Sequence, residues 1–423
     1  MNTQPQSSAR NRVVVIGAGA AGLVAAAESA QRGAEVILLE KNTKTGVKIL
    51  MSGGTRCNLT HDTDARGITD AFGHAKRFLQ HSVGSFPPSA VVEMFNRLGV
   101  PTKRESTGKI FPQSNRAVHV RDALHEHAID SGVKLYLRSG VLSIARVDGT
   151  WQIATEKETL LADRVIVTAG GRSWPDCGTT GDAYSWLEKL GHTIVRTRPA
   201  LVPLVGGEPW MKELSGITLP DCVATVRKSG APRKKKPLIQ RRASWLFTHF
   251  GFSGPAAMDV SGEITAADSL KDVSLWIDLV PDVETEELER QLSDRSGDGG
   301  RQRIASVVGQ WLPKRLTDAI VDRSGGNATI AELPRGAMNE LIENLKHLRL
   351  PVNGTRGFAK AEVTAGGVKL SEVDPKTMAS RKAEGLYIAG EVLDVDGWIG
   401  GYNFQAAFST GRAAAIAATS SGL

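Results

Sequence analysis

The chain has 423 residues, of which 41% are hydrophobic and 23% are charged, and this composition indicates a globular protein with room for two or three domains. No window contains the 18 or more apolar residues that a membrane-spanning helix needs, and the first dozen residues hold no apolar signal segment, so we expect a cytoplasmic protein. Lys and Arg number 52 against 45 Asp and Glu, a net charge of +7, but the excess is local and does not by itself indicate a polyanionic partner.

The first predicted unit is a strand, a tight turn and a helix. The sequence VVVIGAGAAG begins with a β-branched run that is typical of a buried parallel strand and ends at Gly17. Gly17, Gly19 and Gly22 match the pattern G-x-G-x-x-G, in which the glycines allow the turn, the approach of a pyrophosphate and the packing of the helix on the strand. Phosphate would then lie at the N-terminus of the helix.

A second strand follows and ends at Glu40, 18 residues after Gly22. A carboxylate at this place can accept hydrogen bonds from both hydroxyl groups of an adenosine ribose, and it would repel a 2′-phosphate. The complete strand, helix, strand and acid therefore predict a bound dinucleotide. The alternative is a structural unit whose glycines serve packing alone.

The next segment, KTGVKILMSGGTRCNLTH, is rich in glycine and irregular, which favours a loop along a ligand over a helix. Lys48 and Arg56 offer charge to a phosphate or a substrate. Arg56 could also lower the pKa of the neighbouring Cys57 and make it a redox thiol. We favour a small residue packed under the cofactor, because no second cysteine lies at a disulfide-forming spacing. The other cysteines, Cys177 and Cys222, are too scattered for a disulfide framework, so we expect reduced thiols and no metal site.

Helices and short strands complete the first part of the domain. The apolar spacing predicts one helix that starts at Pro87 and Pro88 and ends at Gly99, and a second over residues 117–130. Short strands follow from residue 133 to residue 167. We place the end of this first part of a dinucleotide-binding domain, residues 1–195, just before the pattern changes.

Residues 196–359 read as an insertion. Short strands rich in valine, leucine and threonine come first, and helices follow at about 282–348. His249 lies in a strand-to-turn segment of this insertion, where it could donate or accept a proton for a substrate, although a structural histidine is the interpretation that we favour.

A basic run, RKSGAPRKKKPLIQRR, occupies residues 227–242. Such a run is typical of a solvated hairpin tip. No aromatic residues are interleaved with it, and Trp245 just beyond it is a single ring, so we expect no nucleic-acid interface there.

Residues 360–423 return to the pattern of a nucleotide domain, with a strand, a glycine-rich loop and a helix of small residues that begins near Gly401. The free N–H groups at the start of that helix would stabilise negative charge on a reduced flavin. One of Glu391, Asp394 and Asp396 would bind the ribityl chain or a water beside the pyrophosphate, and the others would shape the loop.

Several longer motifs extend this pattern, and the chain from about residue 12 to residue 417 resembles the BaiN-like flavoproteins, which are NAD(P)/FAD-dependent oxidoreductases of the two-dinucleotide-binding-domain class. The resemblance rests on GAGAAG, KILMSGGTRCNLT, KIFPQSNRAVHVRDAL, GGRSWPDCGTTGDAY, LFTHFGFSGPAAM, AEVTAGGV and GLYIAGEVLDVDGWIGGYNFQAAFSTG. It implies an α/β fold in which a Rossmann-like FAD-binding domain carries an inserted β-barrel-like domain, which in turn carries a small helical domain. The basic run departs from the family, whose members have a glycine-rich and acidic hairpin there.

The resemblance also implies the residues that bind FAD, which would be held tightly and without a covalent link. Glycines and an acid would bind ADP, one residue would meet the adenine, and two later segments would line the flavin. The predicted cofactor-binding residues are Gly17, Gly19, Ala20, Ala21, Gly22, Glu40, Lys41, Lys48, Ser52, Gly53, Arg56, Cys57, Asn58, Val141, Leu142, Ala169, Gly170, Gly390, Glu391, Asp396, Gly400, Gly401, Tyr402 and Asn403. Cys57 and His249 are the candidates for catalysis.

The predicted function is the relay of hydride by FAD between a nicotinamide donor and a small organic acceptor. No second G-x-G-x-x-G followed by an acid is present, so NAD(P)H would visit the flavin transiently, or another donor would reduce it. Two alternatives remain: an RNA-modifying flavoprotein that binds nucleic acid through residues 233–242, and a redox sensor without turnover. The substrate, the choice of nicotinamide, the direction of reaction and the oligomeric state are left open.

Overall fold

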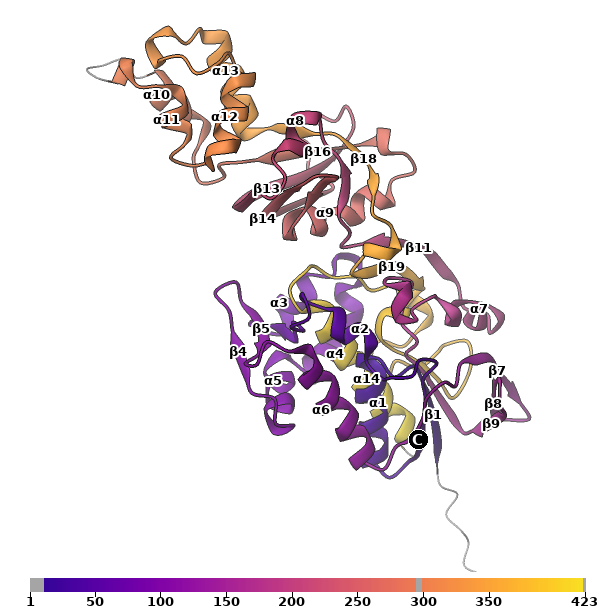
Figure 1. The fold of residues 1–423 in the computed structure, drawn as a ribbon. Helices are drawn as coiled ribbons and strands as arrows, with labels where there is room; N and C mark the ends of the chain where they lie inside the picture. Colours follow the sequence, from indigo (N-terminus) through magenta and orange to yellow (C-terminus); the bar gives the residue numbers. More distant parts are fainter. Residues whose placement is uncertain (1–10, 294–298, 421–423) are drawn as a thin grey trace, which may run out of the picture. The chain divides into compact units, whose positions relative to one another are not determined.

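The computed structural model describes residues 11–293 and 299–420 (Figure 1). The chain divides into two compact units: unit 1 is Met1–Arg198 with Glu362–Leu423, and unit 2 is Pro199–Ala361. Each unit has its own hydrophobic core.

Unit 1 is built on a five-stranded sheet in which all neighbouring strands are parallel. The strand predicted at the start of the chain is confirmed, and its residues Val13, Val14 and Val15 are fully buried, as expected for a strand covered on both faces. In their order across the sheet the strands are β20 (Leu386–Ile388), β10 (Arg164–Val167), β1 (Arg12–Ile16), β2 (Glu35–Leu39) and β6 (Lys134–Tyr136).

Two helices of small residues pack closely against each other. They are α1 (Ala20–Gln31) and α14 (Tyr402–Thr419), which lie side by side (Figure 1). A Cβ on Gly411 would come within 2.4 Å of the carbonyl oxygen of Ala21. The predicted helix near residue 401 is therefore confirmed. The helices predicted after Pro87 and over residues 117–130 are confirmed as α5 (Pro88–Arg97) and α6 (Ala117–Asp130).

The segment after Glu40 is not the continuous loop that we expected, because five of its residues form the short helix α2 (Val47–Met51), which contacts α6. The other elements of unit 1 that matter for position are α3 (Ala65–Asp70), α4 (Lys76–Ser85), α7 (Asp182–Lys189) and three small sheets. In the first of these sheets the order is β3 (Thr60–His61), β5 (Lys109–Pro112) and β4 (Thr102–Arg104). In the second it is β7 (Val141–Val147), β8 (Thr150–Thr155) and β9 (Thr159–Ala162). The third pairs β11 (Ile194–Ala200) with β19 (Val363–Val368).

Unit 2 contains a seven-stranded sheet that stays open. Its edge strands β17 and β18 follow one another in the chain with only Pro351 between them, and the described residues contain no closed sheet. The expectation of a barrel-like insertion is therefore corrected. The order is β17 (Leu348–Leu350), β16 (Val273–Asp278), β13 (Thr218–Lys228), β14 (Ile239–Thr248), β15 (Gly251–Ser253), β12 (Leu204–Gly206) and β18 (Val352–Thr355).

Helices flank this sheet within unit 2. The helix α9 (Pro255–Ala266) packs on β13 and β14, and the basic run lies at the turn that joins these two strands, as expected. The predicted helical part is present as α10 (Thr285–Ser293), α11 (Ile304–Val308), α12 (Lys314–Arg323) and α13 (Arg335–Lys346). The portion of that prediction on residues 294–298 lies outside the described residues. Among the helices of the described residues, none has the length and apolar character needed to cross a bilayer.

Candidate functional site

The carboxyl ends of the parallel strands bring the predicted dinucleotide residues together. Gly17 follows β1, Glu40 follows β2, Thr168 follows β10 and Ala389 follows β20, and these strands are neighbours in the sheet. Parallel strands present their carboxyl ends at one edge, which is where open α/β sheets bind ligands. Ala169, Gly170 and Gly390 are part of the same edge.

The three glycines of the first turn meet different surroundings. A Cβ on Gly17, whose φ is +100°, would lie 2.7 Å from the carbonyl oxygen of Thr168, and a Cβ on Gly22 would lie 1.8 Å from the carbonyl oxygen of Gly17. A Cβ on Gly19 would meet no heavy atom within 4 Å. Gly17 and Gly22 are therefore required by the fold, whereas Gly19 leaves open space at the start of α1, as a bound pyrophosphate needs.

Glu40 is held in place by the backbone around it. Its carboxylate is buried; Oε2 accepts a hydrogen bond from the N–H of Ala18 at 2.9 Å, and Oε1 accepts one from the N–H of Asn42 at 2.8 Å. Each carboxylate oxygen has capacity for a further hydrogen bond, so the group can also receive ribose hydroxyls. No side chain caps the N-terminus of α1, where Ala20 and Ala21 lie, so the N–H groups there can face phosphate.

The residues expected near the adenine lie at the start of β7. Leu142 is 58% exposed, and Gly140 just before β7 lies next to Lys41, with 3.6 Å between an added Cβ and the Cβ of Lys41. The Lys41 ammonium, however, is bonded to Asp182 at 2.5 Å and to Thr180 at 2.7 Å. Lys41 thus has protein partners on and beside α7, and the adenine contact of Val141 or Leu142 stays a prediction.

The charge of Arg56 is already paired. Its guanidinium donates to Glu105 at 2.6 Å and lies 4.0 Å from the ring centre of Phe111. The expected contact of Arg56 with a phosphate or substrate stays a prediction. Ser52 ends α2, and its hydroxyl donates to the carbonyl oxygen of Ile49 at 2.7 Å, while Gly53 is exposed.

Cys57 and Asn58 are buried next to this loop. Cys57 has no exposed surface, and burial raises the pKa of its thiol to about 12, with a smaller opposing effect from Ser52. The thiol is therefore protonated at neutral pH, which favours packing over redox chemistry. Asn58 is 8% exposed, and its Oδ1 has no hydrogen-bond partner among the described residues. A buried acceptor in this state indicates a missing donor.

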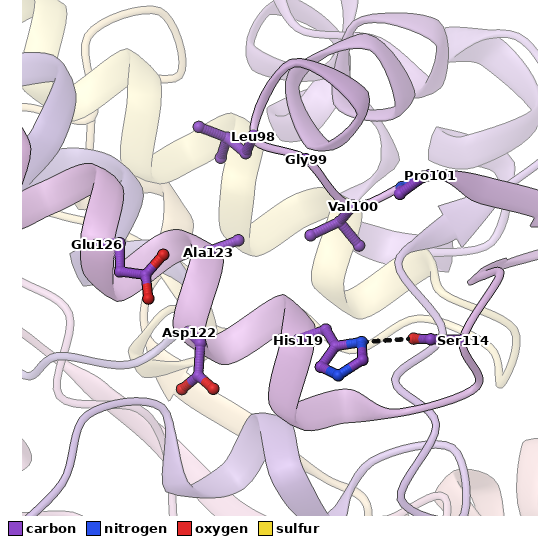
Figure 2. A pocket seen from close by; sticks show the side chains of 9 residues that line it. All are labelled: Leu98, Gly99, Val100, Pro101, Ser114, His119, Asp122, Ala123 and Glu126. Atoms are coloured by element: carbon purple, nitrogen blue, oxygen red, sulfur yellow. Dashed lines mark hydrogen bonds between the residues drawn. The ribbon is translucent and has the colours of Figure 1, made fainter.

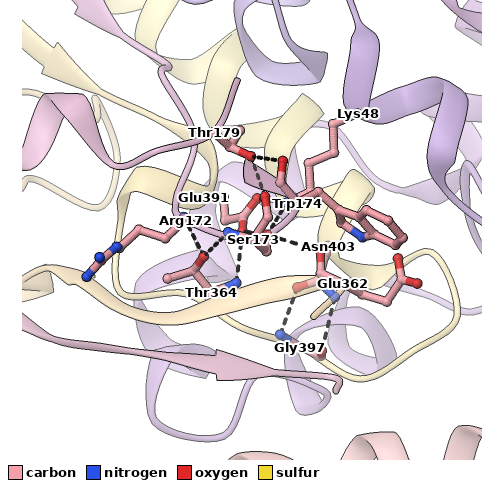
Figure 3. Close-up of polar contacts among 10 residues, drawn as sticks. All are labelled: Lys48, Arg172, Ser173, Trp174, Thr179, Glu362, Thr364, Glu391, Gly397 and Asn403. Atoms are coloured by element: carbon pink, nitrogen blue, oxygen red, sulfur yellow. Dashed lines mark hydrogen bonds and ion pairs between the residues drawn. The ribbon is translucent and has the colours of Figure 1, made fainter. Parts of the chain in front are cut away.

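A polar network joins Lys48 to the loop after β20 (Figure 3). The Lys48 ammonium lies 2.5 Å from Oε2 of Glu391 and also contacts the hydroxyl of Ser173, which donates to Oε1 of Glu391 at 2.7 Å. Both predicted residues, Lys48 and Glu391, are thus brought together, although 343 residues separate them in the chain.

Ser173 and Thr364 were not predicted as site residues. The hydroxyl of Thr364 accepts hydrogen bonds from the N–H groups of Arg172 at 2.7 Å and Ser173 at 3.0 Å, and its own N–H donates to Glu391 at 2.8 Å (Figure 3). Ser173 and Thr364 are fully buried. Ser173 lies in the motif GGRSWP and Thr364 in the motif AEVTAGGV. The hydroxyl residue in each motif is the sequence feature that could have identified them.

Glu362 is a further carboxyl group beside this network (Figure 3). Burial raises its pKa, and the charge of Glu391 adds to this effect, while Lys48 and a hydrogen bond with Trp174 oppose it. No sequence pattern singled it out.

The side chain of Asn403, which we expect at the flavin ring, forms hydrogen bonds with the loop before α14. Oδ1 of Asn403 accepts from the N–H of Gly397 at 2.8 Å, and its Nδ2 donates to the carbonyl oxygens of Gly397 at 3.0 Å and Trp398 at 3.3 Å. Asn403 therefore fixes the loop (Figure 3). Its predicted contact with the flavin stays a prediction.

The start of α14 itself is uncapped by any side chain. Gly401 has a φ of +94°, and a Cβ there would lie 2.5 Å from the carbonyl oxygen of Thr60. Gly400 accepts a hydrogen bond at its carbonyl from Nδ1 of His61 at 3.1 Å if that nitrogen carries the proton, and the His61 ring stacks on Tyr402 at 4.9 Å. The backbone of β3 thus lies close against the glycine turn, and no side-chain cap stands between the start of α14 and a ligand.

His74, Asp394 and Asp396 have potential ligand atoms within 4.8 Å of one another. Nε2 of His74 lies 3.3 Å from Oδ2 of Asp394, whose hydrogen bond raises the pKa of His74, while Oδ1 of Asp394 accepts from the N–H of Gly366 at 3.0 Å. The carboxylate of Asp394 therefore already serves the loop, and the cluster by itself does not indicate a metal ion.

His249 is exposed at the turn between β14 and β15 in unit 2, and its ring meets that of Phe250 edge to face at 5.1 Å. Its catalytic role stays a prediction. In unit 1, a separate pocket opens between the loop after α5 and the helix α6 (Figure 2), and it contains none of the predicted site residues. Its lining is Leu98, Gly99, Val100, Pro101, Ser114, His119, Asp122, Ala123 and Glu126.

Comparisons with known proteins place this geometry in a family. The family model described as HI0933-like protein Rossmann domain matches residues 11–417. A ribosomal RNA dihydrouridine synthase of Escherichia coli is 32% identical over 96% of this chain and 98% of its own length. A 3-dehydro-bile acid delta(4,6)-reductase of Clostridium scindens is 32% identical over 96% of this chain and 99% of its own length.

Among solved structures, the 3-ketosteroid-delta4-(5alpha)-dehydrogenase of Rhodococcus jostii RHA1 is similar to this chain with a TM-score of 0.51 and 14% identity, and the match covers 99% of both chains. At this identity the similarity shows the fold. The uncapped helix, the open space at Gly19 and the unpartnered Oδ1 of Asn58 fit a flavin dinucleotide.

Proposed function

The chain belongs to the HI0933-like Rossmann-domain family, and on that premise we propose that it is a reductase of carbon–carbon double bonds that are conjugated to a carbonyl group. The resemblance to BaiN-like flavoproteins is confirmed, and the chain is an FAD-dependent oxidoreductase.

The substrate class follows from what the names of two relatives have in common. Dihydrouridine differs from uridine by saturation of a ring double bond next to a carbonyl group, and a delta(4,6)-reductase saturates double bonds conjugated to a ketone in a steroid. Both reactions add a hydride to an electron-poor alkene carbon and a proton to its neighbour. We infer that the shared site serves this shared chemistry, in either a free small molecule or a nucleobase.

FAD would be held at both ends by this chain. Gly19, Glu40 and the N-terminus of α1 would bind its ADP part, and Asn58, Glu391 and the N-terminus of α14 would bind the flavin part. When bound, FAD supplies the transfer of a hydride equivalent. Binding would be tight and non-covalent, and NAD(P)H would be a transient donor.

The polar network has a positioning role in this proposal. Lys48 neutralises Glu391, and Ser173 and Thr364 fix the same carboxylate, so that Glu391 keeps one orientation towards its ligand. Glu362, whose pKa is raised by burial, is the candidate for holding the proton that the alkene receives.

One observation supports this proposal most strongly. It is the combination of an unobstructed Gly19 at the N-terminus of α1 with a buried Glu40 that accepts backbone hydrogen bonds. A purely structural βαβ unit would need Gly17 and Gly22 for packing, but it would not need the open position between them.

Anaerobic stopped-flow absorbance tests the substrate class. The FAD-loaded protein is reduced and then mixed with a 4-en-3-one steroid, with free uridine, or with the saturated ketone as a matched control. We expect at least one conjugated alkene to reoxidise the flavin far faster than the saturated ketone does. Equal rates for all three compounds and for buffer would reject the proposed substrate class.

A further inference from the structure

The outer face of the sheet in unit 2 carries an aromatic residue that the sequence did not connect with the basic run. Thr225 of β13 is paired with Gln240 of β14 on one side and with Trp276 of β16 on the other, and Trp276 is paired with Arg349 of β17. Residues directly opposite one another in an antiparallel sheet lie on the same face. Trp276 is therefore aligned in a row across four strands.

The alternate residues show which face this is. Ala224, Val226, Leu275 and Ile277 are buried in the core of unit 2. Arg241, on that same inner face, donates to Asp259 of α9 at 2.9 Å. The row that contains Trp276 therefore lies on the face opposite to α9.

Two arginines lie on the same face of the sheet as the half-buried Trp276. The Arg349 guanidinium lies 6.0 Å from the ring centre, and Arg227 lies two residues from Thr225 on the same face of β13. The hairpin tip next to Arg227 holds the exposed run Lys234–Lys236. We call Arg227, Trp276, Arg349 and Lys234–Lys236 the Trp276 face.

Four acids near this face are in ion pairs, among them Glu343, which pairs with Arg233 next to the three lysines. Asp272, beside the hairpin, accepts a hydrogen bond from the N–H of Ser269 at 3.1 Å. Asp278 lies 2.8 Å from Lys346, and Asp221 and Asp282 both pair with Arg242. Within residues 11–293 and 299–420, the three lysines of the hairpin tip form no ion pair. The Trp276 face therefore combines unpaired lysines with a half-buried aromatic ring.

We propose that the Trp276 face binds single-stranded RNA. Lysines and arginines attract the phosphate backbone, and an aromatic side chain offers a surface on which a base stacks. That the bound base is also a substrate rests on the proposed function. RNA binding to the Trp276 face does not depend on the proposed function. An anionic membrane would attract the same cations, so phosphatidylserine vesicles serve as the competing probe.

Fluorescence anisotropy with a short, fluorescein-labelled, uridine-rich single-stranded RNA tests the proposal at several KCl concentrations. The variant with Lys234→Ala, Lys235→Ala and Lys236→Ala should bind more weakly, and the slope of log K against log salt should fall by about 2, because three phosphate contacts are lost. Lys314→Ala is the matched control, since Lys314 is exposed on α12 and already pairs with Asp318.

The ring is tested separately from the charge. Trp276→Leu should weaken RNA binding by about 5- to 150-fold with the salt slope unchanged, and Trp276→Phe should restore much of the loss. Trp210→Leu is the control, because Trp210 is another half-buried tryptophan of unit 2 with an arginine, Arg323, 4.8 Å from its ring centre. Equal losses in Trp276→Leu and Trp210→Leu would overturn the proposal.

Two further readouts keep the proposals apart. Tighter binding to phosphatidylserine vesicles than to the RNA, or the absence of salt-dependent RNA binding, would overturn the inference even if conjugated alkenes are reduced. RNA binding with the expected losses would uphold it even if no conjugated alkene is reduced, in which case only the proposed substrate class fails.

Discussion

At the scale of single residues, Glu40 makes the sharpest prediction about the cofactor. Its carboxylate accepts two backbone hydrogen bonds and would add the ribose hydroxyls. Glu40→Ala should weaken FAD binding by about 1.5 to 3 kcal/mol, or about 10- to 150-fold, the size of hydrogen bonds to a charged group. Titration of the apoprotein with FAD, followed by flavin fluorescence, measures this loss.

The matched control for Glu40, which follows β2, is Glu35, the first residue of that strand. Glu35 pairs with Arg12 at 3.2 Å and Lys134 at 2.9 Å at the other end of β2, so Glu35→Ala should leave FAD affinity unchanged. If Glu40→Ala and Glu35→Ala bind FAD equally well, Glu40 does not hold the ribose.

Cys57 is expected to act by packing. Because burial raises its pKa to about 12, the reactive thiolate is scarce at neutral pH. Cys57→Ser should keep FAD and most of the rate of flavin reduction by NAD(P)H, measured by anaerobic stopped flow. The control is Cys222→Ser, which changes a second buried thiol in unit 2. Slow reduction in Cys57→Ser alone, with FAD still bound, would make Cys57 a redox participant.

At the scale of elements, the turn between β1 and α1 contains glycines that the fold requires and one glycine, Gly19, that we expect only the ligand to require. The methyl group added by Gly19→Ala meets no protein atom, so the variant apoprotein should unfold at the same urea concentration as the wild-type apoprotein. FAD affinity should fall at least about tenfold, because the methyl group occupies the position of the phosphate. Gly22→Ala should destabilise the apoprotein by about 1 to 3 kcal/mol, the cost of an overpacked contact. A Gly19→Ala protein with normal FAD affinity would contradict this assignment.

The loop after β20 predicts a dependence of stability on pH. A hydrogen bond with Asp394 raises the pKa of His74 above its ordinary value of 6.5, so the protonated histidine stabilises the fold at lower pH. This contribution is fully present below pH 6.5 and is lost as the pH rises through the raised pKa. The stability difference between wild type and His74→Gln, from urea unfolding, should shrink over that interval. A constant difference would show that the pair does not couple to folding.

Local patterns predicted most elements but not the form of the second sheet. The helix over residues 117–130 and the strand at the start of the chain could be predicted because apolar spacing and glycine stops agree there. The short helix α2 was missed because its glycine-rich surroundings favour a loop. Closure of a sheet depends on how its edge strands pair, and local sequence does not contain that information.

At the scale of the whole chain, sequence analysis could predict the parts of the candidate site that lie within one short segment, but not the parts that distant segments contribute together. The glycines and Glu40 lie within one short segment and could be found from spacing. The network of Lys48, Ser173, Thr364 and Glu391 comes from four distant segments, and only the folded sheet brings them together. In the same way, Trp276 is far in sequence from the basic hairpin and becomes its neighbour through strand register.

We propose that this chain holds FAD in the cradle formed by Gly19, Glu40 and the helix N-termini. The most direct test is the absorption spectrum of the purified protein, followed by chromatography of the flavin that denaturation releases. We predict a yellow protein that releases one FAD per chain, unmodified and without a covalent link. A colourless protein that takes up no FAD on reconstitution would contradict the account.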